Sequence, residues 1–359
     1  MERLHIEPLP KNQQPIEKRI SMSNLFKKAI VFTDIHLGQK SNSALHNKDC
    51  EDFVDWMIGV GKREGCETCI FPGDWHHHRN SVNLQTLSTG IRILEKISKN
   101  FDHVYMIPGN HDLYFKDKRD VHGTEWAKHL PNVTVLNTIH KEGDCIFVPW
   151  LVGEEYKQII DAEAKYMFGH FELPHFKMNA MVVMPDHGNL KQSHFSNIEK
   201  VFSGHFHLRQ KQKNIHYIGN AFPHNFSDAG DDQRGCMVLE WGEEEKFYAW
   251  PDQPLYNVYN LSHLIDNADT LLKPKMHVKV PIDVELSYEE ANYIKETFLE
   301  KYQLRELALV ANRSVESVED GSPDQVHFES VDQIITEQIT NISSESYDPN
   351  LLLEIYNTL

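Results

Sequence analysis

Five short polar turns carry side chains that could together bind metal ions. Each turn carries aspartate, asparagine or histidine, in most cases beside a glycine. Imidazole nitrogen combined with carboxylate and carboxamide oxygen is a ligand set that suits Mn, Fe or Zn. Seven donors are too many for one ion, but they suffice for two ions that share a bridging carboxylate. The candidate ligands are Asp34, His36, Asp74, Asn110, His170, His205 and His207.

Each of these turns follows a stretch that is predicted to be a strand. The first three strands are expected at Lys28–Thr33, Thr68–Pro72 and Val104–Ile107, and the last two at Lys165–Phe168 and Lys200–Ser203. Ligands of open α/β sheets bind beyond the carboxyl ends of the strands. A single Asp-x-His or Gly-Asp pair arises by chance, but five such coincidences in order would be needed to explain the set without a common site. The turns are therefore expected to converge.

Helices are expected between the first strands. Apolar residues recur with helical spacing over Asp49–Gly61 and Val82–Ile97. Strands that alternate with helices indicate βαβ units and a sheet with helices on both faces. Further strands are expected at Val133–Leu136, Cys145–Val148, Ile215–Ile218, Gly235–Trp241 and Lys246–Trp250.

A smaller unit of different character follows. Apolar and polar residues alternate over Met276–Leu286, which predicts a half-buried strand. Ser287 and Glu290 match a capping box that opens a helix, and Arg305–Val310 is a further strand candidate. The pattern predicts a small second domain of βαβ type.

The carboxyl-terminal part of the chain is predicted to be a linker followed by two helices. Residues 313–330 are polar, acidic and contain Pro and Gly, which is typical of a linker. Apolar residues then recur every three or four positions from Val331 to Ile342, and Asp348-Pro349 is a suitable start for a second helix. The apolar face that these residues form could pack onto the preceding domain of the same chain, but the linker before it favours binding to a partner.

Composition excludes several classes of protein. Hydrophobic residues make up 40% and charged residues 25% of the 359 residues, as in ordinary globular proteins. No apolar run approaches the roughly 20 residues that cross a bilayer. Five cysteines, an odd number, argue against a disulfide framework and for a reducing compartment. With a net charge of −17, the chain would bind a polyanion only through a metal centre, a local basic patch or a partner.

The ordered set of turns resembles that of the calcineurin-like metallophosphoesterases. In this family two cations about 4 Å apart clamp a phosphate and activate water for its hydrolysis. The resemblance implies that Asp34, His36 and His207 hold one ion, that Asn110, His170 and His205 hold the other, and that Asp74 bridges the two.

The second turn distinguishes between branches of the family. It reads Gly-Asp-Trp-His-His-His-Arg over 73–79, which differs from the Gly-Asp-x-Val-Asp-Arg-Gly of phosphoprotein phosphatases. It resembles the SbcD-type recombination and repair nucleases, and most closely their tailed-phage endonuclease subunits. The resemblance implies that His77 contacts the DNA phosphodiester and that His111 is the general acid for the leaving oxygen. It further implies that Asp112 orients His111.

The same resemblance implies a fold and a set of domains. The fold is α/β, a four-layer α/β/β/α sandwich with a small α/β cap domain and a carboxyl-terminal helical hairpin. Residues 1–24 would be an amino-terminal extension, of which 1–21 are dispensable or reflect a mis-assigned start. The expected boundaries are 25–254 for the nuclease domain, 255–312 for the DNA-recognising cap, 313–330 for the acidic linker and 331–359 for the hairpin.

The implied function is a Mn²⁺-dependent DNA exo- or endonuclease subunit of recombination and repair, with Mg²⁺ as the other candidate metal. It would act with an SMC-like, SbcC-type coiled-coil ATPase bound through 331–359, as a homodimer within a heterotetramer. The expected location is the cytoplasm, that of a bacterial host if a phage encodes the chain. Two alternatives stay open: a phosphomonoesterase or phosphoprotein phosphatase of the same superfamily, and a catalytically silent tether for the ATPase.

Three other features have competing interpretations. Cys66-x-x-Cys69 invites a redox or zinc interpretation, but a single such pair is better explained as structural. The pair Phe171-Glu172, directly after a candidate ligand, either orients a ligand histidine or belongs to a plain turn. Basic residues near the turns, at Arg79, Lys116–Arg119 and Arg209–Lys213, are favoured as contacts to the DNA backbone over solvated charge.

Overall fold

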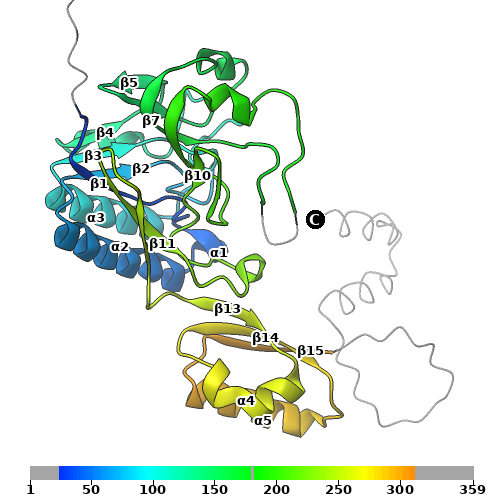
Figure 1. Ribbon diagram of the computed structural model, residues 1–359. Coiled ribbons are helices and arrows are strands. Elements are labelled where there is room, and N and C mark those ends of the chain that lie inside the picture. Colours follow the sequence, from blue (N-terminus) through cyan, green and yellow to red (C-terminus); the bar gives the residue numbers. More distant parts are fainter. Residues whose placement is uncertain (1–23, 179–181, 312–359) are drawn as a thin grey trace, which may run out of the picture.

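The computed structural model describes residues 24–178 and 182–311, and the chain forms two six-stranded sheets and a separate three-stranded sheet (Figure 1). The strands of the first sheet are β1 (Lys28–Val31), β2 (Thr68–Phe71), β3 (His103–Met106), β4 (Val133–Val135), β11 (Gly235–Glu240) and β12 (Lys246–Ala249), in the order β12-β11-β1-β2-β3-β4. The strands of the second sheet are β5 (His140–Glu142), β6 (Cys145–Val148), β7 (Ala164–His170), β8 (Ile198–Gly204), β9 (Gln210–Gln212) and β10 (Ile215–Tyr217), in the order β5-β6-β7-β8-β10-β9.

Two long helices cover one face of the first sheet, and the second sheet covers the other. Side chains of α2 (Ala44–Glu64) and α3 (Leu84–Asn100) form one core with Ile30 of β1, whereas Val31 forms another with β7 of the second sheet. The expectation of helices on both faces is therefore wrong. Ala29 and Val31 are buried on one face of β1 and Ile30 on the other, and all three are apolar, so these residues give no sign of which element covers which face.

The outer face of the second sheet has a thinner cover. It packs against the 3-10 helices η2 (Glu155–Gln158) and η3 (Gln192–Phe195) and against the loop that follows β7, with Ile159, Phe171 and Phe195 in the shared core. The predicted α/β class is confirmed, and this outermost layer consists of short turns and loops in the described part of the chain. Two further 3-10 helices, η1 (Glu125–His129) and η4 (Phe226–Asp228), lie elsewhere.

The cysteine pair at the entry to β2 lies in the core beneath the helices. Cys66 and Cys69 are both buried among the apolar side chains there and form no disulfide. Burial raises the pKa of the Cys66 thiol to about 12. A neutral, buried thiol packs as a small apolar group, which agrees with the structural interpretation of this pair.

The third sheet forms a small α/β unit that lies below the main body in Figure 1. Its parallel strands β13 (Leu255–Val258), β14 (Met276–Ile282) and β15 (Glu306–Ala311) pack with α4 (Leu261–Leu271) and α5 (Tyr288–Lys301). The predicted capping box is confirmed, because the side chains of Ser287 and Glu290 each bond to the other residue's backbone N–H. The predicted linker and hairpin, and the extension up to residue 23, lie outside the described residues.

Among the described residues, no helix has the length and apolar character that crossing a membrane requires.

A largely buried ion pair joins this small unit to the main body. Arg305, just before β15, donates both of its terminal nitrogens to the carboxylate of Asp49 on α2, at 2.6 Å each. The Asp49 side chain is 4% exposed and that of Arg305 is 14% exposed. Nearby, the Lys40 ammonium donates to the hydroxyl of Tyr256 on β13.

Replacing Asp49 by alanine should lower the free energy of unfolding by about 3 kcal/mol, because it leaves a largely buried guanidinium without its partner. Asp52, on the same helix, pairs with the exposed Lys48 and supplies the control. Asp52→Ala should change stability by less than about 1 kcal/mol. Urea denaturation of both variants measures the difference, and equal small effects would show that the Asp49–Arg305 pair does not stabilise the junction.

Candidate metal centre

All seven predicted ligands lie together at one edge of the two sheets. The parallel strands β1, β2 and β3 end there in the first sheet, and the parallel strands β7 and β8 end there in the second. The turns that follow these five strands carry the seven side chains toward a common centre, which is the convergence that the sequence predicted. The side chains are Asp34, His36, Asp74, Asn110, His170, His205 and His207.

One half of the centre consists of Asp34, His36 and His207. The Nε2 atoms of the two histidines are 3.2 Å apart. They lie 3.8 and 3.9 Å from Asp34 Oδ1. This is the group that the family resemblance assigns to one ion.

The other half consists of Asn110, His170 and His205. The oxygen Oδ1 of Asn110 lies 3.0 Å from Nε2 of His170 and 3.1 Å from Nδ1 of His205. Asp74 lies between the two halves, because its Oδ2 is 3.5 Å from Nε2 of His36 and 3.4 Å from Nε2 of His170. The position of Asp74 fits the bridging role that the sequence assigned to it.

The backbone is strained at four of these seven residues. Asp34, His36, Asp74 and His205 have φ angles of 51°, 47°, 63° and 88°, a left-handed region that costs a side-chain-bearing residue of order 1 kcal/mol or more. Backbone hydrogen bonds hold two of them in place, from Asp34 N to Gly73 O and from His36 N to Asp74 O, each 3.1 Å long. Strain of this kind is typical of functional sites, where the backbone must aim a side chain inward.

Glycines allow the strand ends to approach each other closely. A Cβ atom at Gly109 would overlap the carboxylate and the amide nitrogen of Asp74, and one at Gly204 would overlap Thr33 and Asp34. The glycines that flank the polar turns in the sequence are therefore required by close packing.

Two of the histidines have one ring nitrogen fixed by a neighbouring oxygen. His170 donates from Nδ1 to the carbonyl of Pro72 over 2.8 Å, and His205 donates from Nε2 to the carboxylate of Glu172 over 3.1 Å. These acceptors fix the tautomer of each ring, as oxygen acceptors do for metal-binding histidines. Glu172 is thus an orienting residue, the first of the two interpretations that the sequence allowed.

The fixed tautomers test whether the centre fits a cation. In the neutral His170 ring, Nδ1 carries the hydrogen, so the lone pair of Nε2 faces the Asp74 carboxylate at 3.4 Å. In the neutral His205 ring, the lone pair of Nδ1 faces the Asn110 oxygen at 3.1 Å. Electron-rich atoms that face each other in a buried site are favourable only with a cation between them. The donor set therefore fits divalent metal ions.

The pKa values support the same conclusion. Burial raises the pKa of Asp34 to about 7. Burial acts to lower the pKa of His170, but the Asp74 carboxylate beside it outweighs burial and raises the pKa to about 9. Without a metal ion, the proton on His170 thus supplies the positive charge beside Asp74. Burial lowers the pKa of His207 to about 4, which keeps that ring in the neutral form that metals bind.

The ion-pair partners of the Asp34 and Asp74 carboxylates also indicate a site for cations. Across residues 24–178 and 182–311, Asp34 and Asp74 pair with histidine rings and with no lysine or arginine. Two buried carboxylates side by side, without a cationic side chain, are costly unless metal ions neutralise them.

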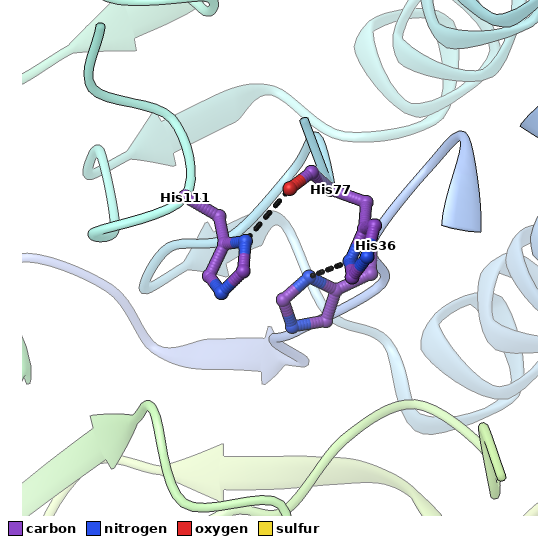
Figure 2. A group of neighbouring side chains, drawn as sticks. All are labelled: His36, His77 and His111. Carbon is purple, nitrogen blue, oxygen red and sulfur yellow. Dashed lines mark hydrogen bonds between the residues drawn. The ribbon is translucent and has the colours of Figure 1, made fainter. Parts of the chain in front are cut away.

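His111 and His77 lie beside His36 at this centre (Figure 2). His111 donates from Nδ1 to the backbone carbonyl of His77 over 2.7 Å, and the two rings stack at 5.3 Å. The backbone N–H of His111 donates to Asp74 Oδ1 over 2.8 Å. His111 is therefore held next to the Asp74 carboxylate by its ring and by its backbone.

Asp112 has a different contact from the one predicted. Its buried carboxylate accepts hydrogen bonds of 2.9 to 3.2 Å from the backbone N–H groups of Gly109, Asp74, Trp75 and His76. These donors turn the carboxylate toward the turn that carries Asp74, and the His77 carbonyl takes the place at the His111 ring that Asp112 was expected to fill. Asp112 therefore stabilises the turn that carries Asp74.

Some of the basic residues that were expected to contact DNA form contacts within the protein instead. Arg119 forms a two-pronged ion pair with Glu155, and its side chain is 8% exposed. Arg209 stacks on Phe247, with its guanidinium carbon 4.0 Å from the ring centre, and Lys211 pairs with Glu245. The hypothesis of DNA contacts is therefore wrong for Arg119, because its charge is neutralised within the fold.

Two residues of the centre were not predicted from the sequence. His46, on α2, donates from Nε2 to the backbone carbonyl of His36 over 2.9 Å. His224 is buried beside His36 and His207, with ring centres 5.5 and 5.4 Å apart. His46 lies on a helix, and His224 lies well beyond the turn that ends the predicted strand Ile215–Ile218, so neither stands directly at a strand end, where the pattern identified the other residues.

The comparisons with known proteins agree with this site. No family model matches the chain. The chain is 26% identical over 339 residues to exonuclease subunit 1 of Enterobacteria phage T4, which covers 91% of this chain and 96% of that protein. It is also 26% identical over 251 residues to the putative phosphoesterase 244L of Invertebrate iridescent virus 6, over 64% of this chain and 85% of that protein.

Likeness to solved structures is low. The phosphoesterase YfcE from E. coli matches with a TM-score of 0.34 and 12% identity, over 63% of this chain and 94% of that one. The nuclease MPE of Pseudomonas putida matches with a TM-score of 0.27 and 17% identity, over 50% and 61%. The ordered polar turns resemble those of the calcineurin-like metallophosphoesterases, and the chain is similar along nearly its whole length to an exonuclease subunit of a phage.

Proposed function

We propose that this protein is a Mn²⁺-dependent DNA nuclease subunit that hydrolyses phosphodiester bonds at a two-metal centre, in recombination and repair. The observation that carries the proposal is the convergence of seven nitrogen and oxygen donors on one buried centre, with His111 and His77 beside it. The T4 relative is named an exonuclease subunit, which supports DNA as the substrate.

Each half of the centre holds one ion in this proposal. Asp34, His36 and His207 ligate the first ion, Asn110, His170 and His205 ligate the second, and Asp74 ligates both. When bound, the two ions activate water for attack and neutralise the charge of the phosphate. The mixture of four imidazoles with carboxylate and amide oxygens favours Mn²⁺ over Mg²⁺, which prefers oxygen ligands and water.

His111 provides the proton for the leaving oxygen in this proposal. Its Nδ1 must carry a hydrogen to donate to the His77 carbonyl, so Nε2 is the nitrogen that exchanges a proton with the substrate. The His77 ring stacks on that of His111, and in the proposed complex it contacts the same phosphodiester.

Substrate class is tested by comparing linear double-stranded DNA with p-nitrophenyl phosphate at equal Mn²⁺ concentration. A nuclease should degrade the DNA and turn over the monoester slowly if at all. The opposite preference would favour the phosphatase alternative. Protein that binds no Mn²⁺ at neutral pH would favour the silent tether.

The partner in this proposal is an SbcC-type coiled-coil ATPase, and the contact is formed by 331–359. The T4 relative is named as a subunit, which supports an assembly of more than one chain. Coexpression of the ATPase with the full chain should yield a complex, whereas a chain that ends at residue 330 should not copurify. A complex that forms equally with both chains would place the contact elsewhere.

Replacing Glu172 by glutamine should weaken Mn²⁺ binding at one of the two sites by about 10- to 100-fold, as loss of an orienting partner does for other metal-binding histidines. Glu172 fixes the His205 ring by accepting from Nε2, and glutamine can turn its amide N–H₂ toward that nitrogen instead. Calorimetric titration of the metal-free protein measures both binding constants.

Glu199→Gln supplies the control, since Glu199 forms an exposed ion pair with Lys165. This variant should bind both ions as the unaltered protein does. Unchanged binding in Glu172→Gln as well would show that the Glu172 contact does not orient His205.

A further inference from the structure

His224 lies beside the metal centre in a loop that none of the seven predicted ligands shares. It precedes η4, and its backbone N–H donates to Asp228 Oδ2 over 2.8 Å. Its side chain is fully buried, and its ring centre is 5.5 Å from that of His36, 5.4 Å from that of His207 and 5.3 Å from that of His46. Three imidazoles therefore surround the ring, together with the Phe222 ring, whose centre is 5.1 Å away.

Neither ring nitrogen of His224 has a hydrogen-bond partner in the described structure. A neutral imidazole always offers one donor and one acceptor, and buried polar atoms are nearly always paired, because leaving them unpaired is costly. The adjacent His46 shows the usual solution, since its Nε2 donates to the His36 carbonyl. An apolar side chain would suit the place of His224 better, unless something else binds the ring.

The position of the ring nitrogens indicates what that partner is. One ligand atom from each of His36, His207 and His224 lies within 4.8 Å of the others. Nitrogens about 2.1 Å from a shared ion lie about 3.0 Å apart at a right angle and about 4.2 Å apart on opposite sides. The separation of 3.2 Å between His36 Nε2 and His207 Nε2 matches the first arrangement, and the upper limit of 4.8 Å on the separations from His224 leaves its ring close enough to share the same ion.

We propose that His224 is a third imidazole ligand of the ion that His36 and His207 hold. The inference rests on the proposed two-metal function and extends it, because His224 adds a donor to that half of the centre.

The experiment is calorimetric titration of metal-free, full-length protein with Mn²⁺, comparing the unaltered chain with His224→Leu and His224→Gln. Both variants should lose affinity at one of two sites by about 10-fold or more and keep the other binding constant. The change should also appear as a smaller rise in melting temperature on adding Mn²⁺. Metal-free His224→Leu should be at least as stable as the unaltered protein, because it removes two unpaired polar atoms.

His216→Leu is the matched control. His216, on β10, is also a buried histidine with an unpartnered Nε2, but its Nδ1 pairs with Glu245 at 3.0 Å. This variant should lose stability and keep both Mn²⁺ constants.

The outcomes separate the two levels of the proposal. If the unaltered chain binds no Mn²⁺, the proposed function is wrong. If it binds two ions, and the His224 variants bind both as tightly, His224 is a packing residue and only the present inference fails. Should His224→Leu fail to fold, His224→Gln decides the question, since it is polar and of similar size.

Discussion

Asp74→Ala should leave the protein unable to bind either metal ion at the two-metal centre and should lower DNA cleavage by at least about 10³-fold. Oδ2 of Asp74 is 3.5 Å from Nε2 of His36 and 3.4 Å from Nε2 of His170, so one carboxylate serves both halves of the centre. Loss of a single electrostatic stabiliser already costs about 10²- to 10³-fold in other enzymes. Loss of both ions should cost more.

The Asp74→Asn variant removes the negative charge of the Asp74 side chain and keeps its size and shape. Asparagine keeps an oxygen that can accept from the backbone N–H of His111, as Asp74 Oδ1 does over 2.8 Å, but it brings no negative charge between two cations. We expect weakened binding of both ions with the fold retained. Metal analysis after gel filtration and a DNA cleavage assay measure the two effects, and the exposed Asp102→Asn is the control. Two ions retained in Asp74→Ala would show that the ligands bind without a shared carboxylate.

The convergence of the seven polar residues was predictable because they carry a local signature. Each follows an apolar strand closely, and most stand beside a glycine. The structure explains this signature, since a side chain at Gly109 or Gly204 would collide with Asp74 or Asp34. The glycines that this backbone geometry requires are therefore visible in the sequence beside the polar residues. The turns occur in the same order along the chain as the strands that they follow.

Contacts that depend on packing had no such signature. Sequence reasoning placed Asp112 at the His111 ring, but four backbone N–H groups draw its carboxylate to the Asp74 turn. His46 reaches the carbonyl of His36 from a helix, and His224 comes from a loop with no strand pattern of its own. Likewise, the apolar faces of β1 could not reveal that one is covered by helices and the other by a second sheet.

The centre is costly to the fold until ions bind. Four ligand residues have left-handed backbone conformations, two carboxylates are buried side by side, and several ring nitrogens face lone pairs of neighbouring oxygens. Ions that bind the folded chain more tightly than the unfolded chain stabilise it in proportion to their affinity. The strain and the buried charge are therefore offset by the same ions that the proposed reaction needs, which links metal binding to stability.

His111→Gln should retain both metal ions and lower DNA cleavage by about 10²- to 10⁴-fold, the usual contribution of a general acid. His111 lies beside the centre, its backbone bonded to Asp74 and its ring to the His77 carbonyl, so its side chain can change without removing a predicted ligand. The exposed His103→Gln on β3 is the control and should cleave normally.

A second substrate distinguishes proton donation from a structural role. Bis(p-nitrophenyl) phosphate releases p-nitrophenolate, a weak base that departs without being protonated, whereas the sugar oxygen of DNA requires a proton. His111→Gln should therefore lose far less activity on this diester than on DNA. Equal losses on both substrates, or a loss of bound Mn²⁺, would show that His111 acts by shaping the centre, through its contacts with Asp74 and His77, and that the leaving oxygen takes its proton from elsewhere.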